Sequence, residues 1–304
     1  MLQSTKKILP YGNIFAGVCA TALCIETNLQ HHLPRNGWPF YFLVLATTAF
    51  YYTYIYVKSV SPYNQDDRIS WYSKHLPTIK KALLITAILI GSDIVYLVVK
   101  YAGSFKALTD FKWGLIALFP IVAMAYNFQI LPFPKLRKLR RIGWMKPFVL
   151  GFIWSGLVTV YPVIFWQIQI KAEAESFALP GGWLWLQNFF FISALCILFD
   201  IKDYSIDMRH RIRTIPIQIG IEKTVQYVVL PLLFLSGLAM AMFYFNRYNV
   251  LWPAALQIIP LGLTYIISMG LSRTRHITYY LFAIDGLMIA KAIIGVLGIY
   301  LLLN

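Results

Sequence analysis

Three aspartates at the end of an apolar segment are the residues in this sequence best suited to chemistry. Asp200, Asp203 and Asp207 follow one another at positions i, i+3 and i+7. On a helix that turns about 100° per residue, these positions fall within an arc of roughly 60°. Three carboxylates on one face repel each other unless a cation lies between them. Carboxylate oxygens suit Mg²⁺, which commonly takes one or two protein carboxylates together with substrate phosphates.

The spacing therefore predicts that Asp200, Asp203 and Asp207 bind a Mg²⁺–diphosphate group. A second interpretation stays open, in which this is a solvated helix end. In that case the acids would pair with arginines on the following turns, namely Arg209, Arg211 and Arg213.

A basic segment supplies cations for the same chemistry. It contains Lys135, Arg137, Lys138, Arg140, Arg141 and Lys146. Apolar residues recur every three positions within it, which is typical of a helix lying at a membrane interface. Lys146 begins the next apolar run and is therefore the residue best placed to reach a diphosphate. For the other residues, simple anchoring at the membrane surface is the competing interpretation.

The residues that follow the aspartates resemble the second aspartate-rich segment of the UbiA-type intramembrane prenyltransferases. That segment has acids in the pattern D-x-x-D-x-x-x-D, then a basic residue before Thr, then Pro and Gly. Here Arg213 precedes Thr214, which lies seven residues after Asp207, and Pro216 and Gly220 follow.

The resemblance implies an all-α, UbiA-like membrane bundle. It also implies Mg²⁺-dependent transfer of a prenyl group from an allylic diphosphate to a lipophilic acceptor, either an aromatic compound or a quinone precursor. Arg213 and Lys146 would then assist with the phosphate charge.

The first acidic motif of that family is missing. It normally reads N-D-x-x-D-x-x-x-D at the end of the second span, where this chain has tyrosines and Lys58 but no acid. If the protein is an enzyme, either Lys58 or a folded-back group of Asn64, Asp66 and Asp67 would replace the motif. Otherwise these three are ordinary loop residues. A non-catalytic homologue that binds prenyl lipid or a protein partner is the main alternative, and a transporter is a further one.

The elements that position these residues are membrane spans. Hydrophobic residues make up 59% of the 304 residues and charged residues 13%, against about 45–50% and 25% in soluble proteins. This composition excludes a soluble, disordered or nucleic-acid-binding protein. About nine apolar runs are long enough to span a bilayer. They cover roughly 12–30, 39–57, 82–102, 113–131, 147–168, 183–199, 226–246, 251–271 and 277–303.

The distribution of Lys and Arg orients these spans. With the N-terminus in the cytoplasm, cytoplasmic segments carry 20 of the 27 Lys and Arg residues, and the opposite side carries five. This bias is what the positive-inside rule predicts. It accounts for the net charge of +15 without a nucleic-acid partner. We therefore expect residues 1–304 to form a single integral domain in the cell (inner) membrane, with the C-terminus outside.

Four charged residues fall within or near the predicted spans, namely Glu26, Asp93, Asp285 and Lys291. A charge in mid-membrane costs roughly 2.5–3.5 kcal/mol on insertion scales, so each should face the protein interior. Asp285 and Lys291 are six positions apart and do not share a helix face. One expectation is that these residues pair with charges on another helix. The other is that the acid faces the substrate and orients an acceptor hydroxyl.

Overall fold

The computed structural model describes residues 11–60, 67–128, 143–170, 179–209, 212–271 and 277–303. Within these ranges the regular elements are helices. Their contacts divide the chain into two compact units. Unit 1 contains residues 1–21 and 36–107, and unit 2 contains residues 22–35 and 108–304. Helix α2, Ile14–Gln30, is continuous and contributes to both. A single domain over 1–304 stays a prediction.

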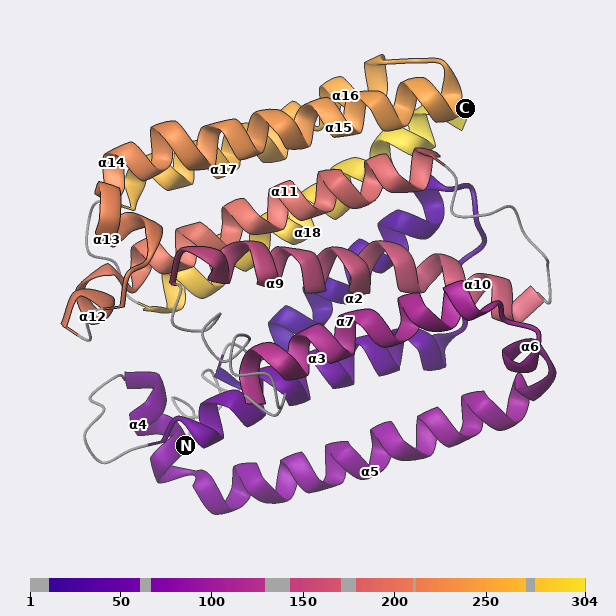
Figure 1. Cartoon of the computed structure of the whole chain (residues 1–304), viewed down its shortest axis with the longest axis horizontal. Coiled ribbons are helices and arrows are strands. Elements are labelled where there is room, and N and C mark those ends of the chain that lie inside the picture. The colour runs from indigo at the N-terminus through magenta and orange to yellow at the C-terminus, as the bar shows by residue number, and fades with distance from the viewer. Residues whose placement is uncertain are drawn as a thin grey trace. The chain divides into compact units, whose positions relative to one another are not determined.

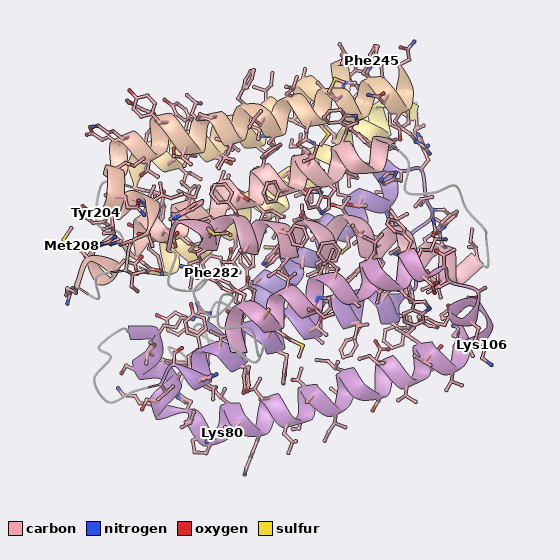
Figure 2. All side chains as sticks on the ribbon, viewed as in Figure 1. Lys80, Lys106, Tyr204, Met208, Phe245 and Phe282 are labelled. Atoms are coloured by element: carbon pink, nitrogen blue, oxygen red, sulfur yellow. The ribbon has the colours of Figure 1, made fainter. Side chains whose placement is uncertain are left out.

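Unit 1 is built around two antiparallel apolar helices, α3 Trp38–Lys58 and α5 Leu76–Lys100, which pack against each other. Besides these and the first part of α2, its helices are α4 Asp67–Lys74 and α6 Ala102–Lys106. The 25 residues of α5 span about 37 Å, enough to cross a bilayer. Lys80 lies near one end of α5, and Lys106 lies just beyond the other (Figure 2). Only 6% of the apolar window of α5 is buried, so most of this helix is suited to contact lipid.

Unit 2 is organised around helix α11, Leu179–Lys202. This helix packs mainly against α9, Lys146–Ser155, and α15, Leu230–Tyr248 (Figure 1). The other elements of unit 2 are α7 Asp110–Phe128, η2 Gly143–Met145, η3 Gly156–Val160, α10 Tyr161–Ile170, α12 Tyr204–Arg209, α13 Ile215–Ile219, α14 Ile221–Thr224, η4 Val225–Val229, α16 Trp252–Leu256, α17 Ile258–Gly270 and α18 Ile277–Leu303. The side chains of Leu184, Phe191, Leu195 and Leu198 on α11 are fully buried and form much of the core.

A π-helical turn, η3, joins α9 and α10 into one long rod. Such turns free backbone carbonyls from the regular ladder. Here the Thr27 hydroxyl donates to the Val158 carbonyl (2.7 Å), and the Cys24 thiol points to the Leu157 carbonyl (3.7 Å). The second half of α2 is thereby fixed to the α9–α10 rod, which begins with Lys146.

Each predicted span coincides with a helix or a run of joined helices. Seven such runs in the described part of the chain are long and apolar enough to cross a membrane. The other two predicted spans correspond to α2, with 17 residues, and α7, with 19. The all-α polytopic membrane fold is confirmed. The largest boundary error is at α5, which begins at Leu76 rather than 82 because Pro77 opens the helix and Lys80 and Lys81 continue it.

Candidate functional site

The end of α11 carries a buried charge pair. Asp200 lies in the last turn of α11 and its side chain is completely buried. The Lys146 ammonium, from the first residue of α9, lies 2.7 Å from Asp200 Oδ1. The second carboxylate oxygen, Oδ2, is also buried and accepts no hydrogen bond. Oδ1 of Asp200 is therefore paired with a fixed cation, and Oδ2 is left without a hydrogen-bond donor.

A close backbone approach holds α9 in this position. Gly143 begins the turn before α9, and a Cβ atom there would lie 2.6 Å from the Arg213 carbonyl oxygen. Because only glycine fits this contact, the start of α9 can pack directly on the segment that contains Thr214. The sequence thus brings two elements 70 residues apart to the same end of α11.

Asp207 is the second buried acid of this region. It lies on α12 and is 7% exposed, and its Oδ2 has no hydrogen-bond partner. Burial raises the pKa of Asp207 to about 6. The Lys146 ammonium and the nearby Thr214 hydroxyl oppose that shift, whereas the carboxylates of Asp200 and Asp203 add to it. Asp207 is therefore part of the same charged cluster as Asp200.

Asp203 departs from the predicted arrangement. Helix α11 ends at Lys202, and Asp203 lies in the turn before α12. Its carboxylate pairs with the neighbouring Lys202 at 2.9 Å. The helical register nevertheless continues, because the Asp203 N–H donates to Phe199 and the Asp207 N–H donates to Asp203. The pairing with Lys202 is possible because the turn lets adjacent side chains meet.

The basic residues near the cluster are mostly turned outward. The Arg209 and Arg213 side chains are exposed. The Arg213 carbonyl accepts a hydrogen bond from Gln218 Nε2, and Arg209 Nε donates to the Ser205 carbonyl. Neither arginine forms an ion pair with Asp200, whose partner is Lys146. Arg211 and residues 132–142 of the basic segment lie outside the described residues.

The cluster fits a divalent cation bound partly by the protein. In the described part of the chain, no group of three His, Cys, Asp or Glu side chains is arranged to hold a metal ion. Two buried carboxylate oxygens without donors remain, on Asp200 and Asp207. Mg²⁺ needs only one or two carboxylates when phosphate oxygens and water complete its coordination. The residues thus suit a Mg²⁺–phosphate group better than a metal ion alone.

The predicted substitutes for the first acidic motif belong to unit 1. Lys58 is the last residue of α3 and is exposed. Asp67 begins α4, and Asn64 and Asp66 lie outside the described residues. Their roles stay predictions.

Three of the four charged residues in the predicted spans are buried, and two of them form an ion pair. Lys291 on α18 pairs with Glu26 on α2 at 2.8 Å, and both side chains are 1% exposed. This confirms the expectation of pairing with another helix. Asp93 is buried on α5.

Comparisons with known proteins bear on the fold. No family model matches the chain, and no curated protein does. The chain is similar to a solved structure described as the apo structure of a UbiA homolog from Aeropyrum pernix K1. The TM-score is 0.64 and the identity 14%, and the match covers 96% of this chain and 99% of that one. The chain therefore has a UbiA-like all-α membrane fold.

Proposed function

We propose that this protein is a UbiA-type prenyltransferase. It would transfer a prenyl group from an allylic diphosphate to a lipophilic acceptor in a Mg²⁺-dependent reaction. The UbiA-like fold supports the proposal, and so does the match of residues 200–220 to the second acidic segment of that family. The observation that carries it is the pair of buried carboxylate oxygens without donors, on Asp200 and Asp207, beside the Lys146 ammonium.

The arrangement suits the ionisation of an allylic diphosphate. The bond between the allylic carbon and its oxygen breaks, and both electrons leave with the diphosphate. A bound Mg²⁺ would neutralise part of the negative charge that develops on this leaving group. Asp200 and Asp207 would hold the ion, and Lys146 adds a fixed positive charge close by. The acceptor then attacks the allylic cation and loses a proton, so no protein nucleophile is required.

The surroundings of the cluster suit an apolar substrate. Helix α11 is largely buried against α9 and α15, and the side chains along it are mainly Leu, Ile and Phe. A prenyl chain and a lipophilic acceptor would both enter from the bilayer. The 20-to-5 division of Lys and Arg supports a cytoplasmic N-terminus, and we propose the cell (inner) membrane as the location.

A transfer assay tests the proposal. The purified protein would be incubated with radiolabelled prenyl diphosphates of several lengths, Mg²⁺ and a panel of aromatic and quinone-precursor acceptors. We expect a lipophilic product and diphosphate release that both stop with EDTA and in Asp200→Asn. The matched control is Asp110→Asn, at the start of α7, which should retain activity.

The second candidate is a UbiA-like protein that binds prenyl lipid without turnover. The absence of acids from the end of α3 favours it, because residues 51–59 contain neither Asp nor Glu. Prenyl diphosphate binding that needs Asp200 but releases no diphosphate with any acceptor would support this candidate and contradict the enzyme.

A further inference from the structure

The segment that joins α11 to α14 stays close to one end of unit 2. Among its described residues are two short helices, α12 with 6 residues and α13 with 5. Both pack against α11, and α12, α13 and α14 lie together at the end of that helix (Figure 1). The runs before and after the segment, Gly181–Lys202 and Ile221–Tyr248, are long and apolar enough to span a membrane. The described residues between 203 and 220 therefore lie at the level of the lipid headgroups, where the two runs leave the bilayer.

Several apolar side chains of this segment are exposed. Met208 is 52% exposed, Ile212 41% and Ile219 40%. Met208 lies at the outer edge of this end of unit 2 (Figure 2). Asp207, its neighbour on the same helix, is buried, so α12 presents one side to the charged cluster and another side outward. Apolar side chains exposed at headgroup level are suited to enter the boundary between headgroups and acyl chains.

A tryptophan lies beside the same segment. The close approach of Gly143 to the Arg213 carbonyl oxygen brings the next residue, Trp144, to this end of unit 2. The Trp144 side chain is 47% exposed. Tryptophan side chains are enriched where the headgroups meet the hydrocarbon. Trp144 therefore indicates the same level of the bilayer as Met208 and Ile212.

Cations lie among these apolar side chains. The Arg209 and Arg213 side chains are exposed, and so is that of Lys223 at the start of the next run. The ion pairs found among the described residues include none of these three cations. Among the described residues from 204 to 223, the exposed acid is Glu222. Three exposed cations against one exposed acid make this surface positive.

We propose that the α12–α13 surface, defined as Trp144, Met208, Arg209, Ile212, Arg213 and Ile219, binds anionic phospholipids. The apolar side chains contact the upper part of the acyl chains, and the two guanidinium groups bind the headgroup phosphates. A guanidinium can bind a phosphate through two parallel hydrogen bonds. A zwitterionic lipid carries the same phosphate together with a cation, so the positive surface favours a lipid with net negative charge.

This inference gives Arg213 a partner other than the substrate. The family resemblance implies that Arg213 assists with the charge of the diphosphate, whereas its exposed side chain suits a lipid phosphate. The inference needs the membrane fold alone, and it does not depend on the proposed reaction.

Counting bound lipids tests the proposal on the full-length protein. The protein in a neutral detergent would be titrated with palmitoyl-oleoyl phosphatidylglycerol and, separately, with the matching phosphatidylcholine, and native mass spectrometry would count the bound lipids. One cation beside an anionic headgroup strengthens binding about fivefold. The double variant Arg209→Gln, Arg213→Gln should therefore weaken the tightest phosphatidylglycerol site roughly 25-fold and change phosphatidylcholine binding less than about twofold.

Matched variants separate this surface from charge in general. Lys80→Gln with Lys81→Gln removes two exposed cations from α5 and should bind phosphatidylglycerol like the parent. Arg209→Lys with Arg213→Lys keeps the charge and should weaken binding less than about fivefold. Met208→Ser with Ile212→Ser should weaken the binding of both lipids alike. Because all these side chains except Lys80 and Lys81 lie on the exposed α12–α13 surface, melting temperatures in lipid-free detergent should match the parent.

Four results would overturn the proposal. They are equal binding of the two lipids by the parent, a Lys80 and Lys81 variant as weak as the Arg209 and Arg213 variant, and a lysine variant as weak as the glutamine variant. The fourth is displacement of phosphatidylglycerol by soluble glycerol 1-phosphate, which would indicate a site for free phosphate instead of a lipid surface.

Discussion

Replacing Lys291 by methionine removes one half of an ion pair that is sealed inside unit 2. Its ammonium lies 2.8 Å from Glu26 Oε2, and Gln30 Nε2 donates to Oε1 at 3.0 Å. Gly295 makes this contact possible, since a Cβ atom there would overlap the Glu26 carboxylate. At this separation the attraction is about 6 kcal/mol at an effective dielectric constant of about 20. Desolvation offsets part of it, so breaking the pair should cost about 3–5 kcal/mol.

The pair Lys202–Asp203, which is only partly buried, provides the comparison. Its atoms are 2.9 Å apart, almost the same distance, but its side chains are 13% and 32% exposed. Such a pair contributes at most about 1 kcal/mol. Lys202→Met should therefore lower stability far less than Lys291→Met. The double variant Glu26→Gln, Lys291→Met leaves no unpaired charge and should recover most of the loss.

Thermal unfolding in detergent measures these effects. A thiol-reactive dye would report exposure of Cys19 and Cys24, which are buried in the folded protein. We expect Lys291→Met to lower the melting temperature by roughly 5–15 °C. A shift of less than about 2 °C, or a double variant as unstable as the single one, would refute the reasoning.

Three further predictions concern unit 2. Lys146→Met should make Mg²⁺ raise the melting temperature more than in the parent, because the ion would replace the lost partner of Asp200; an equal Mg²⁺ effect in both would contradict this. Burial, with the Arg247 charge, lowers the pKa of His31 to about 4. The free energy of unfolding should therefore be highest above pH 6.5 and should fall by up to about 3 kcal/mol toward pH 4, as the unfolded chain takes up a proton that the buried imidazole does not. Denaturation curves of His31→Phe should show no such decrease in the free energy of unfolding between pH 6.5 and pH 4. Gly143→Ala should reduce transfer activity at least tenfold by displacing the start of α9, whereas Gly182→Ala, with open space around its Cβ position, should retain it.

The helices could be predicted because a bilayer demands long apolar runs. The predicted spans match helices because few other structures can satisfy their backbone groups in lipid. Boundaries fail where charged residues continue a helix beyond its apolar part, as Lys80 and Lys81 do in α5. The break after Lys202 was not predictable either, since the carboxylate spacing alone also fits one continuous helix.

The site was only partly predictable for a different reason. Local spacing indicates that Asp200 and Asp207 share a face, and the position of Lys146 at the start of a span predicts that it reaches the same end of the bundle. The contact between Lys146 and Asp200 joins residues 54 positions apart, so it depends on how α9 packs on α11. The hydrogen bonds that Arg68 of α4 donates to the Tyr56 hydroxyl and the Tyr11 carbonyl cannot be predicted from a local pattern either, because these partners lie 12 and 57 positions away.

A structure of the protein with Mn²⁺ and an unreactive prenyl thiolodiphosphate would test the central claim most directly. Anomalous scattering locates the manganese independently of the interpretation of the density. We predict one manganese bound to carboxylate oxygens of Asp200 and Asp207, with the diphosphate on it and the Lys146 ammonium within hydrogen-bond distance of a phosphate or of Asp200. Manganese bound elsewhere, or diphosphate density away from the end of α11, would contradict the account.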